Sequence, residues 1–442
     1  MLRGVDVTDK ARAAALGLLL KWESEGSFAN LLVDSARLDA MEARERALTV
    51  ALFYGTVERT LTLDHYIGVL AARQTAELDP HTRALCRMGL YQLLYTDIPA
   101  HAAVAETVAL GRHTGERALL NGVLRRAAKE PAALTPPPRE RNLARHLSIA
   151  HSIPVPTVRY FLDRLGEEEC GALLAAFNKR PPLALRVNTQ RTDAVSLCTR
   201  FAKEGIEAIP DPLAPYGLLL PAGASVPHLP GYREGDFFVQ DTASQLASAL
   251  LAPNAGDTVL DLCACPGGKS FGAALMMGDN GRVIARDIHE SKLSLITDGA
   301  ARLGLRSVTA ARWDAAVPDP ALLGKVDRVI ADVPCSGIGV IAKKPDLRYR
   351  GLLSVDELCA LSPRILDAGA AALRTGGLMV FSTCTLTHEE NEDTVAAFLD
   401  RHPDFIAEDF AFGDLHSSDG MLTLWPHRHA TDGFFMAKLR RL

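Results

Sequence analysis

Hydrophobic residues recur at helical spacing through the first third of the chain. Between residues 6 and 129, from Asp6 to Lys129, three or four positions separate successive apolar residues, and strand-like alternation is scarce. Asp79-Pro80 is typical of a helix start, and Ile98-Pro99 of a helix end. We therefore predict an all-α bundle whose clearest helices cover residues 11–22, 42–61, 80–94 and 116–128.

Prolines end this pattern and dominate the region that follows. Residues 131–138 contain four prolines, which a helix does not cross because proline lacks the amide N–H and clashes with the preceding turn. We predict a linker there. Beyond it, residues 183–187 are typical of a strand and residues 194–204 of a helix, before further prolines divide the chain into short pieces. We predict a small α+β connecting domain and leave its topology open.

From residue 257 onward, strands alternate with helices. Strands are predicted at residues 258–262, 282–287, 307–311, 326–331, 378–382 and 433–439, with helices from residue 270 and at residues 290–303, 355–373 and 389–401. This order is typical of a doubly wound, Rossmann-like α/β sheet, whose ligands bind at the carboxyl ends of the strands. The predicted domains are an N-terminal all-α bundle (1–135), a small α+β connecting domain (140–235) and a C-terminal α/β domain (236–442).

Composition narrows the class of protein. The 442 residues are 48% hydrophobic and 23% charged, as in a soluble globular protein of several domains. No apolar run reaches the roughly 18 residues of a membrane helix, so we expect a cytoplasmic protein. A net charge of −5 argues against a protein that coats nucleic acid without selectivity. The eight cysteines are scattered, and we expect neither a disulfide framework nor a metal site.

Residues 261–270, Asp-Leu-Cys-Ala-Cys-Pro-Gly-Gly-Lys-Ser, join the first strand of the α/β domain to its first helix. Gly267 and Gly268 allow the backbone to approach a ligand closely. About twenty residues further on, Asp287 ends the second strand, where a carboxylate can bind ribose hydroxyls. The absence of G-x-G-x-x-G argues against NAD. The pattern alone leaves open a dinucleotide, S-adenosylmethionine, or a tight turn without ligand.

Two cysteines follow later strands. Asp332-Val-Pro-Cys335 comes after the fourth strand and Thr383-Cys384 after the fifth. Both cysteines are therefore predicted at the same edge of the sheet as residues 261–270, the cofactor loop. A thiolate that adds to carbon 6 of cytosine makes carbon 5 nucleophilic, and a second group must then assist release. A carboxylate such as Asp332 can hydrogen-bond ring nitrogen 3. This chemistry does not decide which cysteine attacks, and buried packing thiols are the alternative.

Residues 261–270 resemble the first cofactor motif of the Nol/Nop/Sun family of RNA cytosine-5 methyltransferases, usually written DLCAAPGGKT. Cys265 and Ser270 depart mildly from that motif. The resemblance implies S-adenosyl-L-methionine as the cofactor, Cys384 as the nucleophile and Cys335 as the residue that assists release. The cofactor-binding residues that it implies are Cys263, Ala264, Cys265, Pro266, Gly267, Gly268, Lys269, Asp287, Asp314 and Asp332. DNA cytosine methyltransferases lack the Thr-Cys motif, so the presence of both motifs favours RNA.

Residues 119–126 (Leu-Leu-Asn-Gly-Val-Leu-Arg-Arg) resemble the closing helix of NusB-like RNA-binding domains. With the C-terminal motifs, the chain is similar to the bacterial small-subunit (16S) ribosomal RNA methyltransferase B group. The resemblance implies 16S ribosomal RNA as the partner, selected in part through Arg125 and Arg126. Lys343 and Lys344, in a basic run with two arginines, either contact phosphate or lie in solvent.

We expect a monomer with no membrane or metal partner. Three alternatives remain open from the sequence. The helical part can be a purely structural cap. The chain can be a NusB-like RNA-binding or assembly factor whose methyltransferase domain is inactive. It can also be a cytosine-5 methyltransferase that acts on transfer RNA or on DNA.

Overall fold

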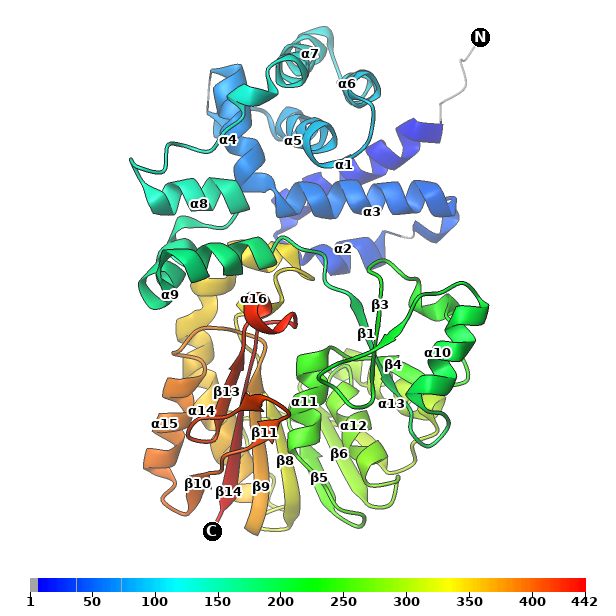
Figure 1. Cartoon of the computed structure of the whole chain (residues 1–442), viewed down its shortest axis with the longest axis vertical. Coiled ribbons are helices and arrows are strands. Elements are labelled where there is room, and N and C mark those ends of the chain that lie inside the picture. Colours follow the sequence, from blue (N-terminus) through cyan, green and yellow to red (C-terminus); the bar gives the residue numbers. More distant parts are fainter. Residues whose placement is uncertain (1–6, 37, 73) are drawn as a thin grey trace. The chain divides into compact units, whose positions relative to one another are not determined.

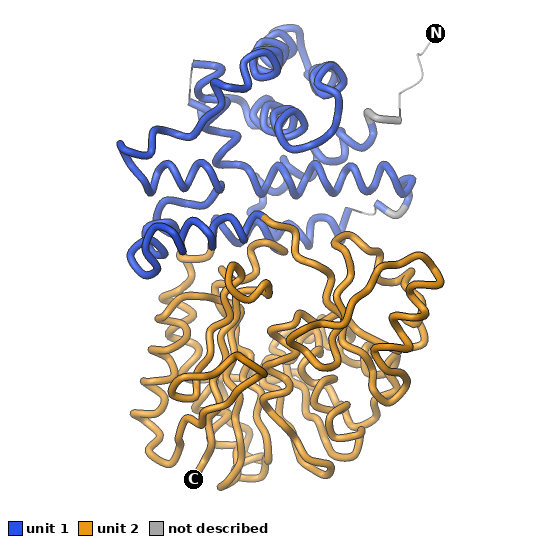
Figure 2. Tube along the Cα trace, viewed as in Figure 1, with its two compact units in different colours: residues 1–178, 344–349 blue, residues 179–343, 350–442 orange. Residues whose placement is uncertain are grey.

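The computed structural model describes residues 7–36, 38–72 and 74–442, which form two compact units (Figure 2). The helical unit comprises the chain up to Asn178 together with Lys344–Tyr349. The sheet unit comprises Lys179–Lys343 and Arg350–Leu442. The chain therefore leaves the sheet unit for one short segment, which joins the helical unit, and then returns.

The helical unit is built from helices, and the first seven of those that the structure describes share one apolar core. The helices of the unit are α1 (Val7–Glu25), α2 (Ala29–Ser35), α3 (Ala43–Glu58), α4 (Thr60–Ala71), α5 (Pro80–Tyr95), α6 (Ala100–Ala109), α7 (Thr114–Lys129), α8 (Leu143–His151) and α9 (Val155–Ala176). Leu52, Phe53 and Leu85 are among the fully buried core residues. Asp79 caps α5 by accepting hydrogen bonds from two backbone amides of its first turn, as its place before Pro80 predicts. The predicted all-α bundle is confirmed; its predicted start at Asp6 lies outside the described residues.

One predicted helix is two helices. The sequence predicts a single helix over residues 42–61, but the backbone leaves the helical region at Arg59 (φ −100°, ψ 10°), between α3 and α4. Val57 and Leu63, on either side of the break, are both buried in the same core. The hydrophobic pattern therefore continues across the break, and neither glycine nor proline marks it.

The segment Lys344–Tyr349 forms a short 3-10 helix, η7 (Pro345–Tyr349), inside the helical unit. Arg348 is buried, and its guanidinium donates hydrogen bonds to the Glu58 carbonyl oxygen and to Asn178 Oδ1, both at 3.0 Å. The basic run after Cys335 is thus divided. Arg348 binds protein oxygens in the interior, and Lys344 is exposed.

The sheet unit begins with a small antiparallel sheet of order β2-β3-β1-β4. Its strands are β1 (Leu183–Val187), β2 (Ile209–Pro210), β3 (Gly217–Leu220) and β4 (Phe237–Val239), and α10 (Ala194–Lys203) packs on them. The amphipathic face of α10 supplies Leu197 and Phe201, which are buried against Leu185 and Phe237. The predicted α+β character is confirmed. The topology that the sequence left open is this four-stranded antiparallel sheet, in which β1 lies between β3 and β4 and α10 connects β1 to β2.

The large sheet has the order β10-β14-β9-β8-β5-β6-β7, with β13 paired to β14. Its strands are β5 (Thr258–Asp261), β6 (Arg282–Asp287), β7 (Val308–Arg312), β8 (Val326–Asp332), β9 (Leu373–Thr383), β10 (Phe405–Ala407), β13 (Met421–Leu424) and β14 (Phe434–Arg441). Strands β5 to β9 are parallel, whereas β14 runs antiparallel to β9. The predicted Rossmann-like sheet is confirmed, and its last strands make it a mixed sheet.

Helices cover both faces of the large sheet (Figure 1). The helices on one face are α11 (Thr242–Leu250), α12 (Gly268–Met276) and α13 (Leu293–Leu303), and those on the other are α14 (Val355–Ala372) and α15 (Glu392–Arg401). Successive strand residues serve opposite cores: Val259 packs with α11 and α12, and Leu260 with α14. Because β5 lies between β6 and β8, the strand order reverses there, and ligands of such sheets bind at the carboxyl ends of the strands at that point.

Candidate active site

The loop after β5 is shaped by Gly267. This glycine has φ 112°, and a Cβ placed on it would lie 2.4 Å from Phe271 Cζ, so other residues are excluded sterically. The turn leads directly into α12, whose first residue is Gly268. The first turn of this helix lies at the carboxyl edge of the sheet, and the N-terminus of a helix suits a polar or anionic ligand group.

Asp261, the last residue of β5, is completely buried at the base of this loop. Its Oδ2 accepts a hydrogen bond from Ser270 Oγ at 2.7 Å, and its Oδ1 has no hydrogen-bond partner among the described residues. Burial raises the pKa of Asp261 to about 7, although the hydrogen bond from Ser270 opposes the shift. A buried carboxylate oxygen without a donor is costly, which fits a site whose ligand supplies one.

Further carboxylates follow the neighbouring parallel strands at the same edge. Asp287 ends β6 and accepts from the backbone N of Cys265 (3.3 Å) and of His289 (2.9 Å). Asp314 follows β7 and is exposed. A ribose diol donates two hydrogen bonds. The carboxylates at this edge can accept them, so the site fits a nucleoside cofactor such as S-adenosylmethionine.

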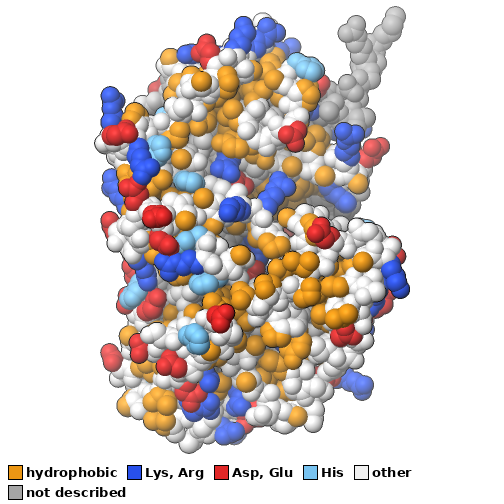
Figure 3. All heavy atoms as spheres, in the orientation of Figure 1, with side chains coloured by type: hydrophobic (Ala, Val, Ile, Leu, Met, Phe, Trp, Pro, Cys, Tyr) orange, Lys and Arg blue, Asp and Glu red, His pale blue; other side chains and the backbone are white. Residues whose placement is uncertain are grey.

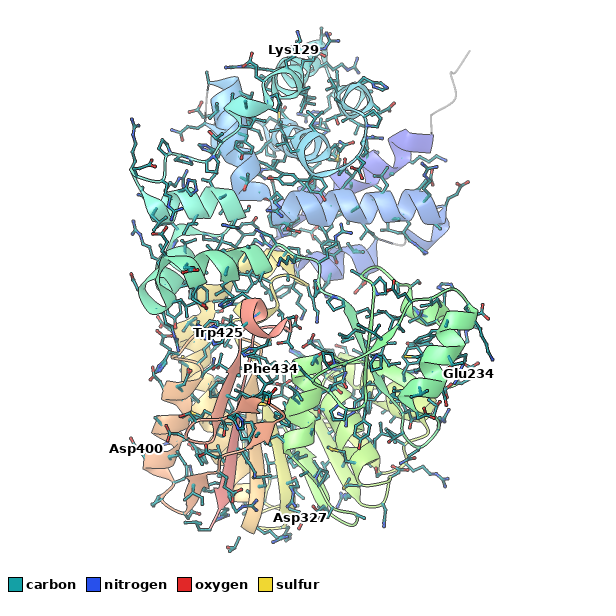
Figure 4. All side chains as sticks on the ribbon, viewed as in Figure 1. Lys129, Glu234, Asp327, Asp400, Trp425 and Phe434 are labelled. Atoms are coloured by element: carbon teal, nitrogen blue, oxygen red, sulfur yellow. The ribbon has the colours of Figure 1, made fainter. Side chains whose placement is uncertain are left out.

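Asp332 ends β8 and lies against Lys269 from the cofactor loop. Lys269 Nζ donates to Asp332 Oδ2 at 2.6 Å, and Ser382 Oγ donates to Asp332 Oδ1 at 2.6 Å. The ammonium group also lies 5.3 Å from the ring centroid of Phe434, the first residue of β14, which is labelled in Figure 4. Lys269 is therefore paired with a carboxylate of the chain itself.

The two motif cysteines meet. Cys335 Sγ and Cys384 Sγ are 3.3 Å apart, although 49 positions separate them in the chain, and both are free thiols. The hydrogen bond with Cys384 and burial raise the pKa of Cys335 well above that of an ordinary thiol. Cys335 therefore keeps its proton and can donate it in the hydrogen bond to the Cys384 sulfur.

The two cysteines of the loop after β5 also have raised pKa values. Burial raises the pKa of Cys263 well above its usual value, and burial together with Asp287 raises the pKa of Cys265 to about 12. Both thiols thus stay protonated near neutral pH. Among the described residues, neither thiol forms a hydrogen bond with Cys335 or Cys384.

The backbone around the pair is closely packed. The Gly339 N donates to the Cys384 carbonyl oxygen at 3.0 Å, and the Gly433 N donates to the Gly339 carbonyl oxygen at 2.9 Å. A Cβ at Gly339 would lie 1.9 Å from the Gly433 oxygen. The loop after Cys335, the loop after Cys384 and the start of β14 are thereby joined through their main chains.

Comparisons with known proteins agree with this geometry. Residues 248–440 match the family described as 16S rRNA methyltransferase RsmB/F, residues 158–227 the RsmF/B-like ferredoxin-like domain, and residues 9–129 the NusB family. A probable ribosomal RNA small subunit methyltransferase B from Synechocystis is 34% identical over 98% of this chain and 99% of its own length. The chain belongs to the ribosomal RNA small subunit methyltransferase B family.

Other members and structures extend the match. The probable ribosomal RNA small subunit methyltransferase B of Bacillus subtilis is 32% identical over 97% of this chain and 98% of its own. The crystal structure of PH0851 is similar with a TM-score of 0.82 and 25% identity, covering 99% of this chain and all of that one. NSun6 from Pyrococcus horikoshii, solved with SFG, shares the fold at a TM-score of 0.60 and 23% identity, covering 65% of this chain and 98% of its own. The resemblance drawn from the motifs is confirmed.

The basic residues that the sequence singled out have differing surroundings. Lys343 Nζ bonds Asp432 Oδ2 at 2.7 Å and also pairs with Asp241, so its charge is balanced within the sheet unit. Arg126 donates to the Leu70 carbonyl oxygen at 3.1 Å, and Arg125 is exposed on the same helix. On the face in Figure 3, basic side chains of the helical unit are interspersed with acidic ones. Their contact with RNA stays a prediction.

The described residues form neither a metal-binding cluster nor a membrane-spanning helix. Within residues 7–36, 38–72 and 74–442, no group of three or more His, Cys, Asp or Glu side chains is arranged to hold a metal ion. None of the helices that the structure describes is long and apolar enough to cross a membrane.

Sequence reasoning missed several residues of the site. Glu390 and Gly433 lie outside both cysteine motifs and approach them only through the fold. Ser382 and Gly339 lie in the segments around the two cysteines, but the sequence assigned them no role. A partial signal was available, because Glu390 and Asn391 are polar and follow Cys384 of the Thr-Cys motif by six and seven positions.

Proposed function

We propose that this protein transfers a methyl group from S-adenosylmethionine to carbon 5 of a cytosine in 16S ribosomal RNA. The observation that carries the proposal is the pair of thiols 3.3 Å apart at the edge of the sheet where the cofactor loop lies. Acyl, phosphoryl or hydride transfer needs no such pair. Methylation at carbon 5 uses both, because one thiol must attack and another group must assist release. The names of the relatives supply the choice of ribosomal RNA.

Residues 263–269 with Asp287 and Asp314 would hold the cofactor, which when bound supplies an electrophilic methyl group. The Cys384 thiolate forms a bond to carbon 6 of the cytosine, and the displaced electron pair makes carbon 5 nucleophilic. Once carbon 5 is methylated, its proton leaves to a base. The electrons of the carbon–hydrogen bond re-form the ring double bond, and the carbon 6–sulfur bond breaks to return the thiolate.

The family resemblance implies attack by Cys384 rather than by Cys335, and the geometry of the site is compatible with that assignment. The raised pKa of Cys335 keeps that thiol protonated, and its S–H then stabilises a thiolate on Cys384. Asp332, held by Lys269 and Ser382, offers its carboxylate to the ring at the same edge. Cys335 remains available to assist proton movement during release.

Substitution of each cysteine tests the proposal. We expect Cys384→Ala to lower the transfer of radiolabelled methyl groups to 16S ribosomal RNA by at least about a thousandfold, because the nucleophile is lost. We expect Cys335→Ala to accumulate a protein–RNA adduct that survives denaturing electrophoresis, because attack proceeds and release fails. Cys198→Ala, a substitution in α10, is the matched control and is expected to behave as the unaltered protein.

The opposite pattern would overturn the assignment. If Cys335→Ala turns over normally, or if the adduct forms only in the Cys384→Ala protein, the roles are wrong. Bisulfite sequencing of ribosomal and transfer RNA from cells with and without the gene decides between the RNA classes. A protein that fails to bind S-adenosylmethionine in calorimetry would favour the RNA-binding factor with an inactive domain.

A further inference from the structure

A buried polar network lies directly behind the two cysteines. Ser336 and Thr385 each follow a motif cysteine by one position, and their hydroxyl oxygens are 2.7 Å apart. Glu390, only 2% exposed, accepts three hydrogen bonds: from Ser336 N at 2.7 Å, from Ser336 Oγ at 2.6 Å and from Thr387 Oγ1 at 2.6 Å. One carboxylate thus holds both the main chain and the side chain of the residue next to Cys335.

The neighbouring residue, Asn391, holds the other cysteine loop. Its Oδ1 accepts from Thr383 Oγ1 at 2.5 Å, and its Nδ2 donates to the Thr385 carbonyl oxygen at 3.2 Å. These two threonines flank Cys384 on either side. The pair Glu390–Asn391, in the turn before α15, therefore holds both loops. Glu390 bonds Ser336 of the Cys335 loop and Thr387 of the Cys384 loop, and Asn391 bonds the two threonines that flank Cys384.

The burial of the Glu390 carboxylate is energetically unfavourable and therefore needs an explanation. Removing an ionised group from water is costly, and replacing a buried charge by a packed apolar side chain is often neutral or stabilising. Three donors satisfy the oxygens of Glu390, yet the charge itself remains near the thiol pair. The hydrogen bond with Cys384 and burial raise the pKa of Cys335 most, and the negative charge of Glu390 adds to that rise. The charge thus acts on the thiol that assists release.

We propose that Glu390 is a positioning residue for the methyl-transfer reaction: through Ser336 it holds Cys335 beside Cys384 so that the methylated base can be released. This inference rests on the proposed function. Attack requires Cys384, and the bonds from Asn391 to the two threonines that flank it do not involve Glu390. Loosening the Cys335 loop therefore slows release more than attack, and the covalent adduct builds up.

The test is Glu390→Gln, which keeps the size of the side chain but replaces one acceptor oxygen by an amide that cannot accept. We expect turnover on 16S ribosomal RNA to fall about 10- to 100-fold, as when a second group supporting a reactive one is lost. We also expect the fraction of protein in covalent adduct to rise, and the pH profile of turnover to shift. Affinity for S-adenosylmethionine stays unchanged. Glu389→Gln, the same change at the exposed preceding position, leaves all four measurements unchanged.

The adduct distinguishes positioning from a structural role. If turnover and adduct fall together in Glu390→Gln, or if neither changes, the inference is wrong. Ser336→Ala removes the hydroxyl's bonds to Glu390 and Thr385 but keeps the backbone bond from Ser336 N to Glu390. It is the second variant if Glu390→Gln melts at a much lower temperature. A rise in its adduct fraction supports the inference, and an unchanged fraction overturns it. If Cys335→Ala itself accumulates no adduct, the proposed function fails, whatever Glu390 does.

Discussion

Asp261 shows, at the scale of one residue, how the burial of a carboxylate in the candidate site makes stability depend on pH. Its carboxylate is buried at the end of β5, with one oxygen bonded to Ser270 and the other without a partner among the described residues. Burial raises its pKa to about 7. The folded protein thus binds a proton on Asp261 more tightly than the unfolded chain does. This stability is fully present below pH 4 and is lost as the pH rises through 7.

Asp261→Asn removes this pH dependence. Between pH 5 and pH 8, without cofactor, we expect the free energy of unfolding of the unaltered protein to fall relative to the variant by a few kcal/mol, at about 1.4 kcal/mol per unit of pH below the folded-state pKa. Urea-induced unfolding at both pH values measures the difference. Asp298→Asn, an exposed change on α13, should follow the unaltered protein. Parallel curves for Asp261→Asn and the unaltered protein would contradict the assignment.

Single residues also show how far a sequence predicts a site. Cys335 and Cys384 follow neighbouring parallel strands, so their placement at one edge follows from the strand pattern alone. Their separation of 3.3 Å does not, because a strand end fixes a side chain only to within several ångströms. Glu390 is harder still. It bonds Ser336 across 54 positions, and nothing local indicates that contact.

At the scale of elements, hydrophobic periodicity predicted strands and helices well where one face is buried. It failed where the pattern continues through a change of direction, as at Arg59 between α3 and α4. Periodicity also did not predict the direction in which the last strand, β14, runs. β14 is as apolar as β9, and only its pairing shows that it runs antiparallel. Apolar alternation records burial, whereas strand direction depends on the connections.

The junction of three elements at Gly339 gives a prediction at this scale. A methyl group there would lie 1.9 Å from the Gly433 oxygen and 2.8 Å from the Cys384 oxygen, both of them backbone atoms. Gly339→Ala must therefore move the loop and lengthen the bond that holds the main chain of Cys384. We expect a loss of stability of about 1–3 kcal/mol and a fall in turnover of about a hundredfold, since small misplacements of reacting groups are costly.

Thermal unfolding and steady-state methylation measure these effects. Gly171→Ala, in α9, has open space around its Cβ position and is expected to leave both measurements unchanged. Binding of S-adenosylmethionine should persist in Gly339→Ala, because the cofactor loop follows a different strand. Full activity of Gly339→Ala would show that methylation does not depend on the close packing of these three segments.

For the whole molecule, the order of segments along the chain is not the order of the compact units. Lys344–Tyr349 follows Cys335 by nine positions and yet belongs to the helical unit. Its contacts join residues about 290 positions apart, so no local pattern predicts them. By composition alone this run was a basic segment with an open role. Its burial shows that Arg348 serves the folding of the helical unit.

Arg348 closes the ends of two helices. Glu58 is the last residue of α3 and Phe177 caps the C-terminus of α9, and the guanidinium donates to the carbonyl oxygens of both, at 3.0 and 3.5 Å. Carbonyls at helix ends lack partners within the helix, and a cation there is favourable. Tyr349 adds a hydrogen bond from its hydroxyl to the Val57 carbonyl oxygen at 2.7 Å.

We therefore expect Arg348→Ala to destabilise the helical unit by about 2–4 kcal/mol, because it leaves several buried acceptors without donors. Arg348→Lys keeps the charge but not the planar fork, and should recover only part of that loss. Amide hydrogen exchange followed by mass spectrometry measures the effect where it arises, in the last turns of α3 and α9. Arg125→Ala, at an exposed position of α7, should leave those turns unchanged, since exposed substitutions stay within about 0.5 kcal/mol. Unchanged exchange in Arg348→Ala would mean that water replaces the guanidinium at the helix ends, and that the segment follows the helical unit without stabilising it.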